Sequence, residues 1–184
     1  MTENYFDLLG MTQSFDIDIQ QLKSNNLQLQ KTLHPDRNLH ETTAQKMLAA
    51  NKLAEVNQAF RTLHSAYDRG EYLLSLLGLT AADETLTVKD PTLLIEQMEL
   101  REELSEIREL DDPEQTLESF SKRVKQIITV QQQQISKLFN DIELTLNEAD
   151  KIQLQIISEA LVKLRFQQKL QQEIIRFEEQ LDDF

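Results

Sequence analysis

The sequence predicts an all-α protein with two parts: an N-terminal antiparallel helical hairpin with short flanking helices, and a C-terminal three-helix bundle. The first observation is the scarcity of turn residues, with three Gly, three Pro and no Trp in 184 residues. Leu, Gln, Glu, Lys and Ala dominate instead, and this composition favours long helices over a sheet. The second observation is that apolar residues recur every three or four positions along several long segments.

In the N-terminal part, residues 5 to 9 form a short apolar segment that ends at Gly10. Asp16 or Asp18 is a suitable N-cap for the first hairpin helix, which must end before Pro35. Its apolar face consists of Ile19, Leu22, Leu29 and Leu33. Asn26 falls on the same face, where a buried amide needs hydrogen-bond partners, so it either pairs or faces a gap.

The second hairpin helix follows a polar stretch at 34–43. Its apolar series steps by four and three residues and comprises Ala49, Leu53, Val56, Phe60, Leu63 and Tyr67. We expect the two helices to be antiparallel, with residues 5 to 9 packed across them. A short helix at 71–77 should then end at Gly78. These patterns place the first domain at 1–78 and a linker at 79–91, with Pro91 as the first residue of the next helix.

Three further amphipathic segments predict the bundle at 92–184. They run from Leu93 to Leu110, from Leu117 to Leu138 and from Ala149 to Leu181. The run of four Gln at 131–134 lies inside the second of these segments. We expect it to form a solvated face.

Composition also excludes several classes of function. The chain has no Cys, which removes disulfides, thiolate catalysis and Cys-ligated zinc or iron-sulfur sites. We find no phosphate-binding loop, activated nucleophile or metal set, so we expect neither an enzyme nor a bound cofactor. The N-terminus lacks a signal peptide, and no apolar run is long enough to span a membrane. These features predict a soluble cytoplasmic protein.

The net charge of -13 is unevenly distributed. Residues 1–70 hold eight acidic and seven basic side chains, whereas residues 71–184 hold twenty-four acidic and twelve basic ones. An acidic surface repels nucleic acid. A basic or mixed protein surface is the better partner for the second part.

The tripeptide His34-Pro35-Asp36 lies between the two hairpin helices. Pro35 ends the first helix, so His34 and Asp36 are presented on an exposed turn. In the plainer alternative, Pro35 is only a helix stop and Asp36 only a cap. A metal site with His40 fits no standard ligand spacing, and no nucleophile accompanies the His-Asp pair.

This arrangement resembles a J domain, in which a short helix precedes an antiparallel pair joined by a His-Pro-Asp loop. The resemblance extends over nearly the whole chain to the HscB family, through the segments NYFDLLG, KTLHPDR, VNQAFRTL, GEYLLSLLG, LLIEQMELREELSEI, LESFSKRVKQ and KLRFQQKL. It implies a co-chaperone whose J domain stimulates a DnaK- or HscA-type chaperone ATPase and whose bundle delivers an IscU-type iron-sulfur scaffold. The chaperone-binding residues that it implies are Lys23, Lys31, His34, Pro35, Asp36 and Arg37. The basic face before the loop is sparse, because only Lys23 and Lys31 lie on that helix.

The helix that begins near Pro91 carries two apolar faces. On a wheel of 100° per residue, Leu93, Leu100, Leu104 and Ile107 gather within about 40° and form the core face. Leu94, Ile95 and Met98 point about 100 to 200° away, beside Glu99, Glu102 and Glu106. The pattern leaves open whether this second face packs under the first domain or binds a partner. The resemblance implies that it binds the scaffold, through Leu94, Ile95, Met98, Glu99, Glu102, Glu106 and Phe166.

Two other functions remain open at this point. A J protein for general unfolded clients would bind extended apolar peptides rather than a folded scaffold. A passive helical adaptor would stimulate no ATPase.

Overall fold

The computed structural model describes residues 4–33, 42–78, 91–142 and 148–182. The chain divides into two compact units, Met1–Leu77 and Gly78–Phe184, and every regular element in the described ranges is a helix. The fold class predicted from the sequence is therefore confirmed. Within these ranges no helix has both the length and the apolarity needed to cross a bilayer. The segments 34–41 and 79–90, which contain the His-Pro-Asp tripeptide and most of the expected linker, lie outside the described residues.

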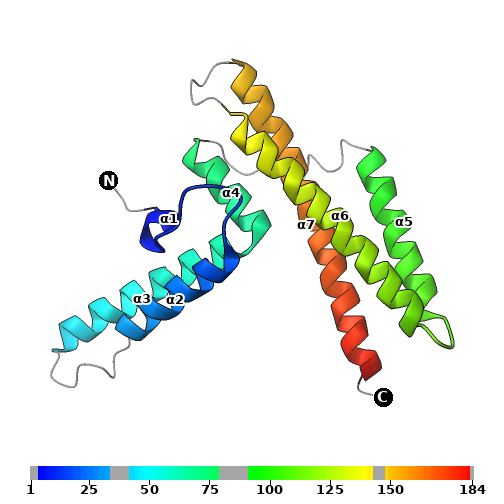
Figure 1. Cartoon of the computed structure of the whole chain (residues 1–184), viewed down its shortest axis with the longest axis horizontal. Coiled ribbons are helices and arrows are strands. Elements are labelled where there is room, and N and C mark those ends of the chain that lie inside the picture. The colour runs from blue at the N-terminus through cyan, green and yellow to red at the C-terminus, as the bar shows by residue number, and fades with distance from the viewer. Residues whose placement is uncertain (1–3, 34–41, 79–90, 143–147, 183–184) are drawn as a thin grey trace. The chain divides into compact units, whose positions relative to one another are not determined.

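The first unit is built on an antiparallel pair of helices, α2 (Ile19–Leu33) and α3 (Thr43–His64) (Figure 1). The side chain of Asp18 caps α2, because its Oδ1 accepts from the backbone N–H groups of Gln20 at 2.8 Å and Gln21 at 3.1 Å. A capping box formed by Thr42 and Gln45 starts α3. Local sequence signals thus start both of the helices that flank the segment 34–41.

The short helix α1 (Tyr5–Leu8) is held by tertiary contacts. Its Tyr5 ring stacks on Tyr72 with centroids 4.5 Å apart, and the Tyr5 backbone N–H donates to the Tyr72 hydroxyl at 2.9 Å. Phe6 and Leu9 are fully buried in the core of the unit. Gly10 follows with φ of 62°, a left-handed conformation that glycine adopts without strain. Four residues cannot form a stable helix alone, so this packing is what orders α1.

The helix after α3 begins earlier than the sequence pattern predicted. We expected a helix at 71–77 and assigned Tyr67 to the preceding one, but the structure shows α4 at Ala66–Leu76. Ser65 breaks the helical run because its backbone is extended and its side chain accepts from the Asp68 N–H. The prediction was wrong because the apolar period continues across Ser65, whereas a local serine cap ends one helix and starts another.

A buried arginine joins three parts of this unit. Arg69 on α4 donates from Nε to the Phe15 carbonyl at 2.7 Å and from a terminal nitrogen to the Leu63 carbonyl near the end of α3. Its guanidinium also lies 5.1 Å from the centroid of the Phe15 ring. Burial lowers the pKa of Arg69 to about 10, although nearby Asp16 raises it. Arg69 therefore stays charged at neutral pH and locks the segment before α2 onto the α3–α4 junction.

Asn26 is the polar residue that the sequence placed on the apolar face of α2. The structure buries it, with 8% of its surface exposed, and its Oδ1 has no hydrogen-bond partner. Nearby Asn25 behaves differently, since its Nδ2 donates to the Leu9 carbonyl at 2.8 Å. The expected pairing is therefore not found for the acceptor oxygen of Asn26.

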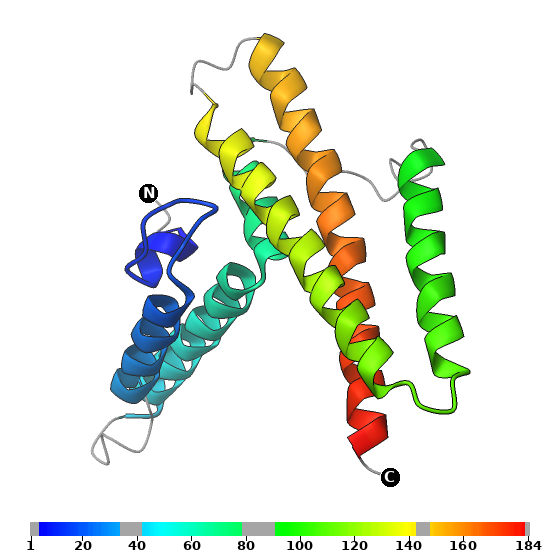
Figure 2. The same ribbon diagram turned by 45° about the vertical axis from the view of Figure 1, so that its right-hand side comes forward.

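The second unit contains α5 (Pro91–Arg108), α6 (Glu114–Asn140) and α7 (Glu148–Asp182). Helices α5 and α7 run in the same direction and α6 is antiparallel to both (Figures 1 and 2). The core is formed largely by α6 and α7 and includes Leu117, Phe120, Val124, Ile128, Ile135, Leu154, Ile157, Leu161, Leu164 and Ile174. Pro91 is the first residue of α5, as expected from its fixed φ and its lack of an N–H donor.

The glutamine run on α6 does not form a wholly solvated face. Gln131 is buried and donates from Nε2 to the Ala160 carbonyl of α7 at 3.1 Å, whereas Gln133 and Gln134 are exposed. The expectation was therefore wrong for the first residue of the run. A composition argument treats four glutamines alike, but consecutive residues on a helix point in directions 100° apart.

Candidate docking site

The two sides of α5 differ in burial. Leu93, Leu104 and Ile107 are buried against the rest of the bundle, and Leu100 is half-buried. Leu94, Ile95 and Met98 are exposed to 49%, 55% and 62%, respectively. We call these three side chains the docking face. Because adjacent large apolar side chains on one side of a surface helix are seldom left in water, the docking face is a candidate interaction surface.

Carboxylates border the docking face. Glu99, Glu102 and Glu106 are all exposed and follow one another along α5 at helical spacing. An apolar centre with a charged rim is the usual composition of a protein interface, because the centre supplies the affinity and the rim selects charge. A basic partner surface would match this rim.

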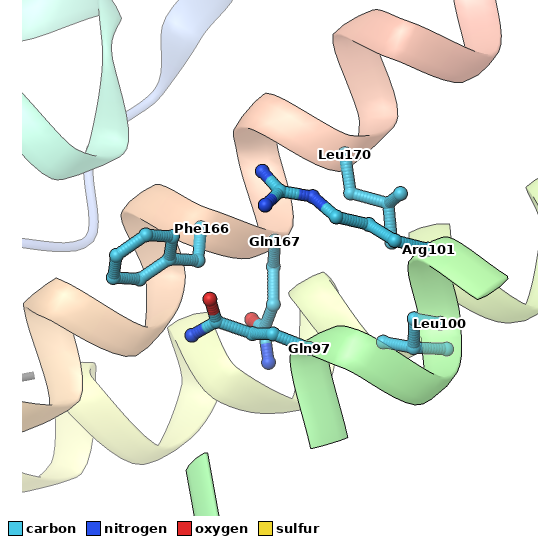
Figure 3. A pocket seen from close by; sticks show the side chains of 6 residues that line it. All are labelled: Gln97, Leu100, Arg101, Phe166, Gln167 and Leu170. Atoms are coloured by element: carbon cyan, nitrogen blue, oxygen red, sulfur yellow. The ribbon is translucent and has the colours of Figure 1, made fainter. Parts of the chain in front are cut away.

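Phe166, on α7, lies beside α5. It is half-buried and lines a small pocket together with Gln97, Leu100, Arg101, Gln167 and Leu170 (Figure 3). The Lys169 Nζ lies 5.7 Å from the centroid of the Phe166 ring. The structure therefore brings Phe166 to the groove between α5 and α7, next to the helix that carries the docking face. Phe166 and the docking face are about seventy residues apart in the sequence, and the parallel packing of α5 and α7 brings them close together.

Ion pairs attach α5 to its neighbours. Lys163 contacts Glu96 at 2.7 Å and Arg101 contacts Glu173 at 3.6 Å, and both pairs join α5 to α7. Arg123 of α6 pairs with Glu103. All of these side chains are substantially exposed, so each pair adds little stability on its own. They join α5, which buries few large side chains, to both of the other helices of the bundle.

The residues expected to bind a chaperone lie in the first unit. Lys23 and Lys31 are exposed on α2, separated by eight residues or about 12 Å of helix. His34, Pro35, Asp36 and Arg37 lie outside the described residues. The described part of this site is thus a pair of lysines on the helix that leads into the tripeptide segment.

Sequence reasoning missed several residues of the groove between α5 and α7. Gln97 and Gln167 were not singled out, because a glutamine on a helix has no distinctive pattern. Arg101 and Lys169 were likewise treated as ordinary surface charges. Their position around Phe166 depends on how α5 packs on α7, and no local signal encodes that packing. Among the described residues, no group of three or more His, Asp or Glu side chains could hold a metal ion.

Comparison with known proteins defines the class of this chain as a co-chaperone. The family model described as the HSCB C-terminal oligomerisation domain matches residues 89–175. The co-chaperone protein HscB homolog of Shewanella baltica strain OS223 is 37% identical over 180 residues, which cover 98% of this chain and 99% of that protein. The chain belongs to the HscB family.

Solved structures agree with this assignment. The chaperone HscB from Vibrio cholerae superposes with a TM-score of 0.81 at 32% identity and covers 97% of this chain and 99% of its own. Human co-chaperone protein HscB gives a TM-score of 0.79 at 26% identity, with 96% and 83% covered. The fold is thus that of HscB proteins, an N-terminal J domain and a C-terminal helical bundle. The Shewanella and human relatives are named as co-chaperones, and the Vibrio protein is named as a chaperone.

Proposed function

We propose that this protein is a two-site adaptor in iron-sulfur cluster biogenesis. Its J domain, assigned to residues 1–78, stimulates the ATPase of a DnaK- or HscA-type chaperone. Its bundle, assigned to residues 92–184, carries an IscU-type iron-sulfur scaffold to the same chaperone. Residues 79–91 connect the two.

The chaperone-binding site consists of the tripeptide His34-Pro35-Asp36, with Lys23, Lys31 and Arg37 as cationic contacts. Support comes from the family assignment and from the exposure of both lysines on α2. Positive side chains steer the loop toward an acidic surface of the ATPase. The tripeptide then stabilises the conformation of the chaperone that hydrolyses ATP.

The scaffold-binding site consists of the docking face with Glu99, Glu102, Glu106 and Phe166. The observation that carries this proposal is the exposure of Leu94, Ile95 and Met98 to 49%, 55% and 62% on a helix whose opposite side is buried. Burial of these apolar side chains supplies the binding free energy, and the carboxylates select a basic partner surface. Because both partners are held by one chain, each is present at a high local concentration for the other.

Steady-state ATPase measurement with the cognate chaperone tests the proposal. The expected result is stimulation by this protein alone and a larger, synergistic stimulation when scaffold is added. A J protein for general unfolded clients would instead show synergy with extended apolar peptides and none with scaffold. If neither addition changes hydrolysis, the chain is a passive adaptor and the proposal fails.

A further inference from the structure

Two glutamine side chains on neighbouring helices each bury a polar atom that has no hydrogen-bond partner. These atoms are Nε2 of Gln97 on α5 and Oε1 of Gln167 on α7. Gln167 is only 7% exposed, so nearly the whole side chain has been withdrawn from water. Buried polar atoms are almost always paired in folded proteins, because an unpaired one is destabilising. An unpaired donor beside an unpaired acceptor therefore needs an explanation.

Both side chains line the pocket that also includes Phe166, Leu100 and Leu170 (Figure 3). Its volume is about 20 Å³, which is room for one group the size of a water molecule. The last torsion of a glutamine side chain is soft, so either carboxamide can turn toward this space at small cost. The pocket can thus bring one donor and one acceptor onto a single small group.

The pocket adjoins the docking face. On the wheel measured from Leu93, Gln97 and Arg101 lie at about 40° and 80°, and Leu94 and Met98 follow at about 100° and 140°. Gln97 and Arg101 therefore occupy the border between the buried side of α5 and the docking face, whereas Leu100 lies on the buried side. Phe166 continues the same surface onto α7. A partner seated on the docking face would lie over the mouth of this pocket.

We propose that the pocket is a specificity site that receives the hydroxyl group of one Ser or Thr side chain of the scaffold. Gln97 Nε2 donates to the hydroxyl oxygen, and the hydroxyl proton is donated to Gln167 Oε1. This inference rests on the proposed function, since it names the chemistry by which the same surface recognises its scaffold. No other group in the described part of this chain pairs with the two amide atoms, and the hydroxyl of the bound partner completes their hydrogen bonds.

The size and chemistry of the pocket select a hydroxyl over other groups. A hydroxyl donates and accepts through one atom, whereas a peptide or carboxamide group does so through two and needs more room. A carboxylate of the partner would need Arg101 as its counter-ion in the pocket, but Arg101 already contacts Glu173 at 3.6 Å. A partner that lacks the hydroxyl leaves both amides buried and unpaired, and sites of this kind discriminate strongly against such analogues.

The first test uses full-length Gln97→Leu and Gln167→Leu, with Gln172→Leu as the matched control because Gln172 is exposed on α7 and outside the pocket. Scaffold affinity is measured by isothermal titration and stability by thermal unfolding. We expect each pocket variant to bind scaffold about tenfold more weakly or worse. Its unfolding midpoint should hold or rise, since an unpaired buried atom is removed. The control should match the wild type in both measurements.

Wild-type affinity in folded pocket variants overturns the inference and leaves the proposed function intact. If the wild type and the control fail to bind scaffold at all, it is the proposed function that fails. A lower unfolding midpoint with unchanged affinity would show that the two amides bond to each other in the free protein, which also overturns the inference.

A second measurement needs no variant of this chain. In the wild-type protein, the side-chain amide resonances of Gln97 should shift on addition of scaffold and lose their magnetisation transfer from water. Replacing interfacial Ser and Thr residues of the scaffold by Ala, one at a time, should identify one position that abolishes this shift. Water contact that persists in the complex, or a shift that survives every replacement, would assign the pocket to a bound water and overturn the hydroxyl assignment.

Discussion

At the scale of single residues, the chain contains polar groups that reduce stability and others that are placed for contact. Asn26 and Gln167 are both buried with an unpaired oxygen, yet they differ in surroundings. Gln167 lines a pocket beside the docking face, whereas Asn26 lies within the helical pair of the first unit. Removing the amide should therefore have different consequences at the two positions: weaker scaffold binding at Gln167 and a more stable first unit at Asn26.

Asn26→Leu should stabilise the first unit. The leucine side chain has a similar size, and it removes a buried oxygen that has lost water without gaining a partner. We expect the free energy of unfolding to rise by about 1 kcal/mol. Urea denaturation followed by circular dichroism measures this change, with exposed Asn51→Leu on α3 as the control. A fall in stability would mean that the Asn26 oxygen is paired in solution.

His34→Gln should abolish chaperone stimulation without unfolding the protein. The sequence places His34 on the turn after α2, so we expect it to contribute little to the core, and surface substitutions change stability by no more than about 0.5 kcal/mol. Steady-state ATPase should fall to the basal rate of the chaperone, while helicity and the unfolding midpoint stay unchanged. Full stimulation by the folded variant would rule out the tripeptide as the contact that acts on the ATPase.

At the scale of the helical element, α5 carries two kinds of contact residue: apolar side chains that should supply the affinity for scaffold, and carboxylates that should select a basic partner surface. Its buried side holds it in the bundle and its docking face is free to bind, so the two sides can be changed independently. We expect replacement of Leu94, Ile95, Met98 and Phe166 together by Ala to weaken scaffold binding by about 3 kcal/mol or more. Isothermal titration measures the loss.

The same apolar variant should keep its stability and its ability to stimulate the chaperone alone. Three of the four side chains are about half exposed or more in the free protein, so their truncation removes little core. A large drop in the unfolding midpoint would instead identify these side chains as part of the bundle core. A folded variant with normal affinity would place the scaffold on another surface.

The carboxylates of α5 should act on the rate of association. Glu99, Glu102 and Glu106 are exposed, and rim charges steer encounter more than they hold a complex together. Replacing all three by Gln should slow association with scaffold by roughly three- to tenfold and flatten its dependence on ionic strength. Stopped-flow mixing at several salt concentrations measures both effects. A change confined to the dissociation rate would mean that the carboxylates are buried at the interface.

At the scale of the whole molecule, the proposed function requires both sites on one chain. A mixture of two full-length variants tests this, one with His34→Gln and the other with the four alanine substitutions of the docking face and Phe166. Each variant keeps one site, so the mixture contains both sites but on separate molecules. We expect no synergy between scaffold and mixture in the chaperone ATPase, because the gain in effective concentration requires a covalent link. Synergy equal to that of the wild type would contradict the tethering mechanism.

Much of this architecture was readable from sequence because its signals are local. The end of α2 at Leu33, ahead of Pro35 in the sequence, the cap at Asp18 and the start of α5 at Pro91 depend on backbone chemistry within a few residues. Helical periodicity also distinguished the buried side of α5 from its docking face, because both faces are defined by the spacing of residues along a single helix. The boundary at Ser65 was missed because the apolar period hid a cap that is equally local.

The sequence by itself determined the fold class, the helices and the two faces of α5, because capping and periodicity act along one segment of chain. Only the tertiary structure decided which side chains from different helices meet. It buried Gln131 against the Ala160 carbonyl, joined Arg69 to Phe15 and Leu63, and brought Gln97 and Gln167 to one pocket. The physical reason is that such contacts depend on the relative position and rotation of packed helices, and many side chains set these together.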